Sequence, residues 1–199
     1  MDANVGQLFI PVVEKAHFES FCGIPVKQIR DSAITRVDMK DSKLGPCGGV
    51  ILAHCLKSNS SVTVVEAFGC AFGAEGGKAM AEALEANKSM EQISVGNVIA
   101  GSTVKLKSSG ELCTVHRYYN SDPSRPCITL PNGSTKDDVK PSEFEPIPAV
   151  LPLKKLRDNT ITELDLKNSG LGVDGGMMLA AVLKSNSSVT KVSDDVWLV

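Results

Sequence analysis

ITELDLKNSGLGVDGGMMLAAVLKSNSS, residues 161–188, has a close counterpart earlier in the chain, ITRVDMKDSKLGPCGGVILAHCLKSNSS, residues 34–61. Residues 24–65 match residues 151–192 at 24 of 42 positions, with a constant offset of 127. The octapeptide LKSNSSVT is common to both copies. Repetition at a fixed spacing is the sequence pattern of an array of similar structural units. The two copies therefore decide how the rest of the chain is interpreted.

Further copies follow the first at a regular spacing. VTVVEAFGCAFGAEGGKAMAEALEANKS begins at Val62 and MEQISVGN begins at Met90, so Ile34, Val62 and Met90 open successive units with a period of 28. Each full copy has alternating apolar residues, then a turn with glycines, then an apolar stripe with helical spacing. Alternation predicts a short strand and the stripe predicts a helix. We expect a left-handed cap at the asparagine just past each helix: Asn59, Asn87 and Asn186.

This pattern resembles the leucine-rich repeat of the ribonuclease-inhibitor type, which also occurs in NOD-like receptors and in the GTPase activator of Ran. The resemblance covers about residues 24–97 and 149–193. It implies an α/β fold, a leucine-rich-repeat solenoid with parallel strands inside and helices outside. It carries no specific catalytic residue onto this chain.

A nucleotide site is the alternative interpretation of the glycines. The stretch from Gly170 to Gly175 fits the dinucleotide-binding pattern G-x-G-x-x-G. However, Lys43 and Ala71 stand where the other copies should repeat Gly170. The fold that carries this pattern also needs several more strands after Asp194. We therefore expect no cofactor, and we assign the recurring glycines to the turn before each helix.

An insertion interrupts the repeats, because the step from Met90 to Ile161 is much longer than the step from Ile34 to Val62. Short alternating runs separated by turn residues, among them Asn132-Gly133, predict four or five strands and hence a small all-β barrel. It looks similar to Src-homology-3 or Tudor barrels. The expected segments are a helical cap with repeats (1–97), the barrel (98–148) and further repeats (149–199).

The barrel offers a possible aromatic binding surface. Its candidate residues are Tyr118, Tyr119 and Phe144. The alternative is that one or two of these rings fill the barrel core and the rest are ordinary surface.

Composition and charge exclude several classes of function. A net charge of −2 gives no basic footprint for a nucleic-acid partner, and no apolar run is long enough for a membrane span. The six cysteines contain no C-x-x-C pair, and the three histidines fall in different predicted units. We therefore expect no metal, no catalytic residues and no enzyme activity. The expected compartment is the cytoplasm, with the nucleus as the alternative.

The predicted function is protein recognition by a scaffold or adaptor, through side chains on the inner curve of the repeats. The predicted partner-binding residues mix both charge signs around one exposed phenylalanine: Arg36, Asp38, Lys40, Val64, Glu66, Phe68, Gln92, Glu163, Asp165, Lys167 and Lys191. The alternatives are regulation of an enzyme, as a GTPase activator or an inhibitor, and a structural subunit of a larger complex. Trp197 and Leu198 follow the last predicted strand without predicted cover. Three alternatives stay open: they fold back over the last repeat, a partner or (by self-association) a second copy covers this carboxyl edge, or the chain is a fragment of a longer repeat array.

Overall fold

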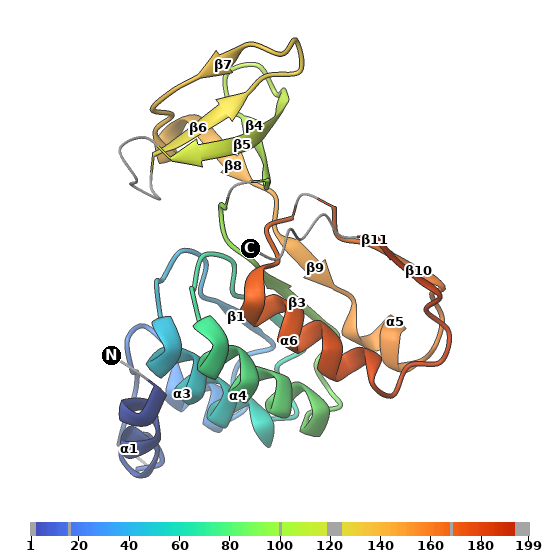
Figure 1. The fold of residues 1–199 in the computed structure, drawn as a ribbon. Coiled ribbons are helices and arrows are strands. Elements are labelled where there is room, and N and C mark those ends of the chain that lie inside the picture. Colours follow the sequence, from blue (N-terminus) through green and yellow to red (C-terminus); the bar gives the residue numbers. More distant parts are fainter. Residues whose placement is uncertain (1–2, 16, 100, 119–124, 168, 194–199) are drawn as a thin grey trace.

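A computed structural model of the chain describes residues 3–15, 17–99, 101–118, 125–167 and 169–193 (Figure 1). The helices are α1 (Ala3–Val13), α2 (Val26–Arg30), α3 (Gly45–Lys57), α4 (Gly73–Ala86), α5 (Leu153–Arg157) and α6 (Gly172–Leu183), with a 3-10 turn η2 (Pro141–Glu143). The strands are β1 (Arg36–Asp38), β2 (Val64–Glu66), β3 (Gln92–Val95), β4 (Thr103–Leu106), β5 (Leu112–Tyr118), β6 (Pro126–Thr129), β7 (Thr135–Lys136), β8 (Phe144–Pro146), β9 (Ala149–Leu151), β10 (Glu163–Asp165) and β11 (Lys191–Ser193).

The main sheet has four strands in the order β1-β2-β3-β9. The pairs β1/β2 and β2/β3 are parallel, and equivalent residues of successive repeats lie opposite each other, as Arg36, Val64 and Gln92 do. β9 is antiparallel to β3, with Val150 opposite Ser94. The sheet is therefore mixed, and its parallel part ends at β3.

The predicted leucine-rich-repeat solenoid is wrong, and the family resemblance with it. In a solenoid β10 would lie beside β3 and continue one parallel sheet. Instead β9 occupies that edge, and β10 pairs with β11 in a separate two-stranded sheet. One strand edge offers a single row of N–H and C=O groups, so an edge that β9 has filled cannot accept another strand. The molecule has a different α/β fold that combines mixed, parallel and antiparallel sheets.

The predicted barrel is also wrong. The inserted segment forms an open antiparallel sheet in the order β7-β6-β5-β4-β8, and β7 does not pair with β8 to close it. β7 has only two residues, which is too little backbone for a second row of hydrogen bonds. This sheet has its own apolar core, which includes Val104, Val115 and Ile128.

The helices form a row against one face of the main sheet, in the order α1, α3, α4, α6 (Figure 1). Leu52, Met80 and Ile93 are fully buried in the shared core, where each contributes about 1.5–3 kcal/mol through the hydrophobic effect. Residues from before and after the insertion share this core, because α6 packs directly on α4. No helix in the described part of the chain is long and apolar enough to cross a membrane.

Candidate functional site

A cluster of charged side chains lies on the face of the main sheet that the helices leave uncovered. Glu66 in β2 is only 6% exposed, and its carboxylate accepts a hydrogen bond from the Arg36 guanidinium at 2.7 Å. The Lys40 ammonium lies 3.7 Å from the other carboxylate oxygen. Both cations remain about half exposed, at 55% for Arg36 and 48% for Lys40. We call these three residues the Glu66 cluster.

In the Glu66 cluster the buried carboxylate orders two cationic side chains that remain accessible to solvent. A buried carboxylate needs compensating partners, so Glu66 strongly favours conformations in which Arg36 and Lys40 remain close to it. Asp38, which lies opposite Glu66 in the sheet, is exposed. Its carboxylate accepts the backbone N–H of Lys40 at 3.1 Å and thereby holds the turn after β1. The face thus presents ordered charges of both signs to solvent.

The other predicted partner-binding residues fall into two groups. Val64 and Gln92 are half-buried, and Phe68 is only 4% exposed, so the predicted exposed phenylalanine is not on the surface. On the separate β10–β11 sheet, four charged residues are exposed: Glu163, Asp165, Lys167 and Lys191. The structure therefore divides the predicted row between two sheets.

The predicted aromatic surface of the insertion is not assembled from the described residues. Phe144 is buried in the core of the five-stranded sheet. The Tyr118 hydroxyl donates a hydrogen bond to the carbonyl of Val98 at 2.7 Å, and its ring packs against the same core. Tyr119 lies outside the described residues.

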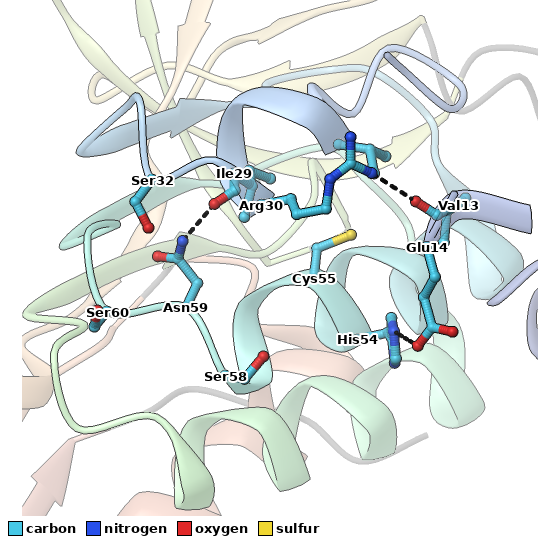
Figure 2. A pocket seen from close by; sticks show the side chains of 11 residues that line it. Val13, Glu14, Ile29, Arg30, Ser32, His54, Cys55, Ser58, Asn59 and Ser60 are labelled. Atoms are coloured by element: carbon cyan, nitrogen blue, oxygen red, sulfur yellow. Dashed lines mark hydrogen bonds and ion pairs between the residues drawn. The ribbon is translucent and has the colours of Figure 1, made fainter. Parts of the chain in front are cut away.

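A small cavity of about 250 Å³ lies between the ends of α1, α2 and α3 (Figure 2). The Arg30 side chain crosses it and donates hydrogen bonds to the carbonyls of Val13 at 3.2 Å and Lys15 at 3.0 Å. His54 Nε2 lies 3.0 Å from a carboxylate oxygen of Glu14 at the rim. The sequence contains no signal for this cavity, because its walls come from three separate elements.

Cys55 in this cavity is unsuited to nucleophilic chemistry. Burial raises the pKa of its thiol to about 11, while the charge of Arg30 acts in the opposite direction. A thiol with that pKa is protonated near neutral pH, and the thiolate is the reactive form. The residue therefore acts as a small apolar group in the wall.

A second cavity, of about 400 Å³, repeats the first one in the second copy of the repeat. Arg157 takes the place of Arg30 and donates to the carbonyls of Met90 at 2.6 Å and Leu84 at 3.0 Å. Ala181 and Val182 stand at the positions of His54 and Cys55. The two cavities are therefore consequences of a duplicated arginine that satisfies main-chain carbonyls, and the histidine and thiol are not part of that shared feature.

A buried carboxylate joins the two halves of the repeat region. Asp174, in the first turn of α6, is 6% exposed and accepts N–H groups of Phe72 at 3.2 Å and Gly175 at 3.0 Å. Burial raises its pKa above the ordinary value. Among the described residues no group of three or more His, Cys, Asp or Glu lies together as a metal site would require.

Comparison with known proteins leaves the structural description unchanged. No family model, no curated protein and no solved structure matches the chain. The resemblance to ribonuclease-inhibitor-type repeats therefore has no family match to support it, and the interrupted sheet already contradicts it.

Proposed function

We propose that this protein is a non-enzymatic binding module that holds a protein partner against the uncovered face of the main sheet. The observation that carries the proposal is the Glu66 cluster, in which one buried carboxylate orders two half-exposed cations. Arginine is enriched at the energetic centres of protein interfaces. Ordering it before binding reduces the conformational entropy that association costs.

The partner chemistry follows from what the face presents. The accessible groups nearest the centre are the Arg36 and Lys40 cations, with Val64 half-buried beside them. A partner that offers a carboxylate or carbonyl oxygens to Arg36 and a small apolar side chain to Val64 would complement these groups. We infer that the exposed charges of the β10–β11 sheet widen this interface.

The test is a triple variant that removes the cations without leaving a bare buried carboxylate: Arg36→Ala, Lys40→Ala and Glu66→Gln. Tagged wild type and variant are used to capture partners from the native cell, and the captured proteins are quantified by mass spectrometry. We expect at least a tenfold loss of specific partners. The matched control, Lys57→Ala with Lys78→Ala, removes two exposed cations from the helix row and should capture as wild type does. Equal capture by the triple variant and the control would remove this face from the function.

We also propose that the protein works in the cytoplasm, with the nucleus as the alternative. All six cysteines are free thiols, and Cys22 is exposed. Free thiols are typical of reducing compartments. Fluorescence microscopy of the tagged full chain tests this directly.

A further inference from the structure

Each of the first three helices in the row has a glycine where the next helix comes closest. A Cβ added at Gly6 of α1 would lie 2.9 Å from the carbonyl oxygen of Cys47 in α3. At Gly49 of α3 it would lie 2.9 Å from Cα of Gly76 in α4. At Gly77 of α4 it would lie 2.6 Å from Cα of Asp174 in α6. Real Cβ atoms essentially never make contacts this short, so the next helix can come this close only because each of these positions is a glycine.

Gly176 of α6 is the fourth glycine of this kind, and no described helix packs against it. It is equivalent to Gly49 and Gly77, yet no described atom lies within 4 Å of a Cβ built there. Ala180 on the same stripe is exposed, whereas its equivalents Ala53 and Ala81 are 4% and 9% exposed beneath the next helix. The outer face of α6 thus has the surface that the two preceding helices use for packing, but without a described helix on it.

The opposite end of the row is α1, and its outer face is uncharged, with one exposed leucine among Asn4, Gln7 and Pro11. Leu8 is 76% exposed and stands two residues from Gly6, about 200° around the helix axis, so it points away from α3. Asn4 and Pro11, near Leu8 on the helix surface, are exposed and uncharged. Among the described residues, Leu8 and Val173 of α6, at 60%, are the two most exposed large apolar side chains.

Charge distinguishes these end helices from α4 in the middle of the row. α1 contains no charged residue, and the only one in α6 is the buried Asp174. α4, in contrast, carries four exposed charged side chains: Glu75, Lys78, Glu82 and Glu85. Surfaces that meet in an interface lose their water, so an uncharged face costs much less to bury than a charged one.

We propose that copies of this chain associate head to tail, with the outer face of α6 around Gly176 receiving the outer face of α1 around Leu8 of the next copy. The contact continues the helix row, with the Leu8 side chain of one copy against the uncovered surface at Gly176 of the other. Its two surfaces are different, so the contact is heterologous, and copies add to one another until a ring closes or a filament forms. The Glu66 cluster lies on the sheet and not on the helix row, so partner binding and self-association are separable.

Sedimentation velocity of the full chain at increasing concentration tests the proposal. We expect species larger than a monomer whose fraction rises with concentration. Leu8→Asp blocks one end and Gly176→Arg blocks the other, and each variant alone should sediment as a monomer. An equimolar mixture should form a one-to-one dimer and nothing larger, because each variant retains the end that the other has lost. Leu112→Asp, the same change at a 56% exposed leucine in β5, should associate as wild type does.

Three results would overturn head-to-tail association. One is wild-type protein that stays monomeric, which leaves the face to a partner other than a second copy. The others are a single variant that still associates and a mixture that stays monomeric. Circular dichroism confirms that the variants fold, and Val173→Asp replaces Gly176→Arg if that variant does not. The partner-capture experiment has a different readout, so either proposal can fail alone.

Discussion

At the scale of single residues, Asn87 joins its own loop to the end of the preceding repeat unit. Its amide nitrogen donates to the carbonyls of Leu56 and Asn59, each at 2.7 Å. Its amide oxygen accepts the N–H groups of Ser89 at 3.0 Å and Met90 at 2.9 Å. The backbone there is extended, with φ −77° and ψ 122°, so the predicted left-handed cap is wrong. The asparagine recurs because its side chain bonds to neighbouring units.

Replacing Asn87 by alanine should lower the free energy of unfolding by about 3 kcal/mol, because buried carbonyls and N–H groups lose their partners. Asn186→Ala is the matched comparison. That residue is half-buried, and its amide nitrogen donates to one backbone carbonyl, that of Leu156, so we expect roughly half the loss. Urea unfolding followed by circular dichroism measures both values. An Asn186 variant that is the less stable of the two would contradict this account.

Asp174 gives the stability a pH dependence of its own. Burial raises the pKa of its carboxyl, so the folded state binds the proton more tightly than the unfolded state does. This contribution to stability is complete below the unfolded pKa and is lost as pH rises through the folded pKa. The free energy of unfolding of wild type minus that of Asp174→Asn should therefore fall as pH rises from 4 toward neutrality. Urea unfolding of both proteins at several pH values checks the slope, and a difference that rises with pH would contradict it.

No sequence signal could have found Asp174. Its equivalents in the other copies are Cys47 and Glu75, so the repeat pattern does not single out an acidic residue there. The role depends on its neighbour in space, the N–H of Phe72, which is 102 residues away in the chain. For Phe68 and Glu66 the error was the opposite one. Alternation predicted that both side chains lie on one face of the sheet, but it did not reveal that both are buried there.

At the scale of elements, the short helices α2 and α5 each bring an arginine to the end of a longer helix. The last carbonyls of a helix have no partner within it. Arg157 of α5 supplies donors to Leu84 and to Met90 just beyond α4, as Arg30 of α2 does for Val13 and Lys15 at the end of α1. A five-residue helix that would not be stable alone is thereby fixed in place.

Arg157→Ala should lower the free energy of unfolding by about 1–3 kcal/mol, since two carbonyl groups lose a charged donor. Hydrogen exchange should also become faster in the last turn of α4. Lys155→Ala, at an exposed position of the same helix, is the control and should change stability by less than about 0.5 kcal/mol. Unchanged exchange in α4 would mean that Arg157 does not hold its end.

The repeat period predicts local pairing but not how far that pairing extends. Equivalent residues of neighbouring repeats do pair in parallel, as Arg36 with Val64 and Glu163 with Lys191. The continuation past β3 failed because of β9, a three-residue strand between Pro148 and Pro152. So short a segment has no alternation to detect, and its pairing is set by the free edge of β3.

At the scale of the whole molecule, the helix row is continuous whereas the sheet is divided. α6 packs on α4 although the insertion lies between them in the chain. The hydrogen bonds that join the halves include Phe72 N–H to Asp174, and Asn97 N–H to the carbonyl of Gly170 at 2.9 Å. The insertion contributes its own core to neither contact. The fold therefore depends on the packing of α6 against α4 more than on the inserted sheet.

The insertion should be removable. Val95 and Ala149 lie opposite each other in the β3–β9 pair, so the two ends of the excised segment are already close. Replacing residues 98–148 by a Gly/Ser linker of about six residues should leave a helical protein with one cooperative unfolding transition, because antiparallel neighbours need only a short connection. Circular dichroism and thermal unfolding measure this.

The control deletion of residues 98–151 removes β9 as well, uncovers the edge of β3 and should lose cooperativity. If both deletion variants lose cooperative unfolding, the inserted sheet is required for the fold. If only the control loses it, partner capture with the shorter deletion shows whether the insertion takes part in binding.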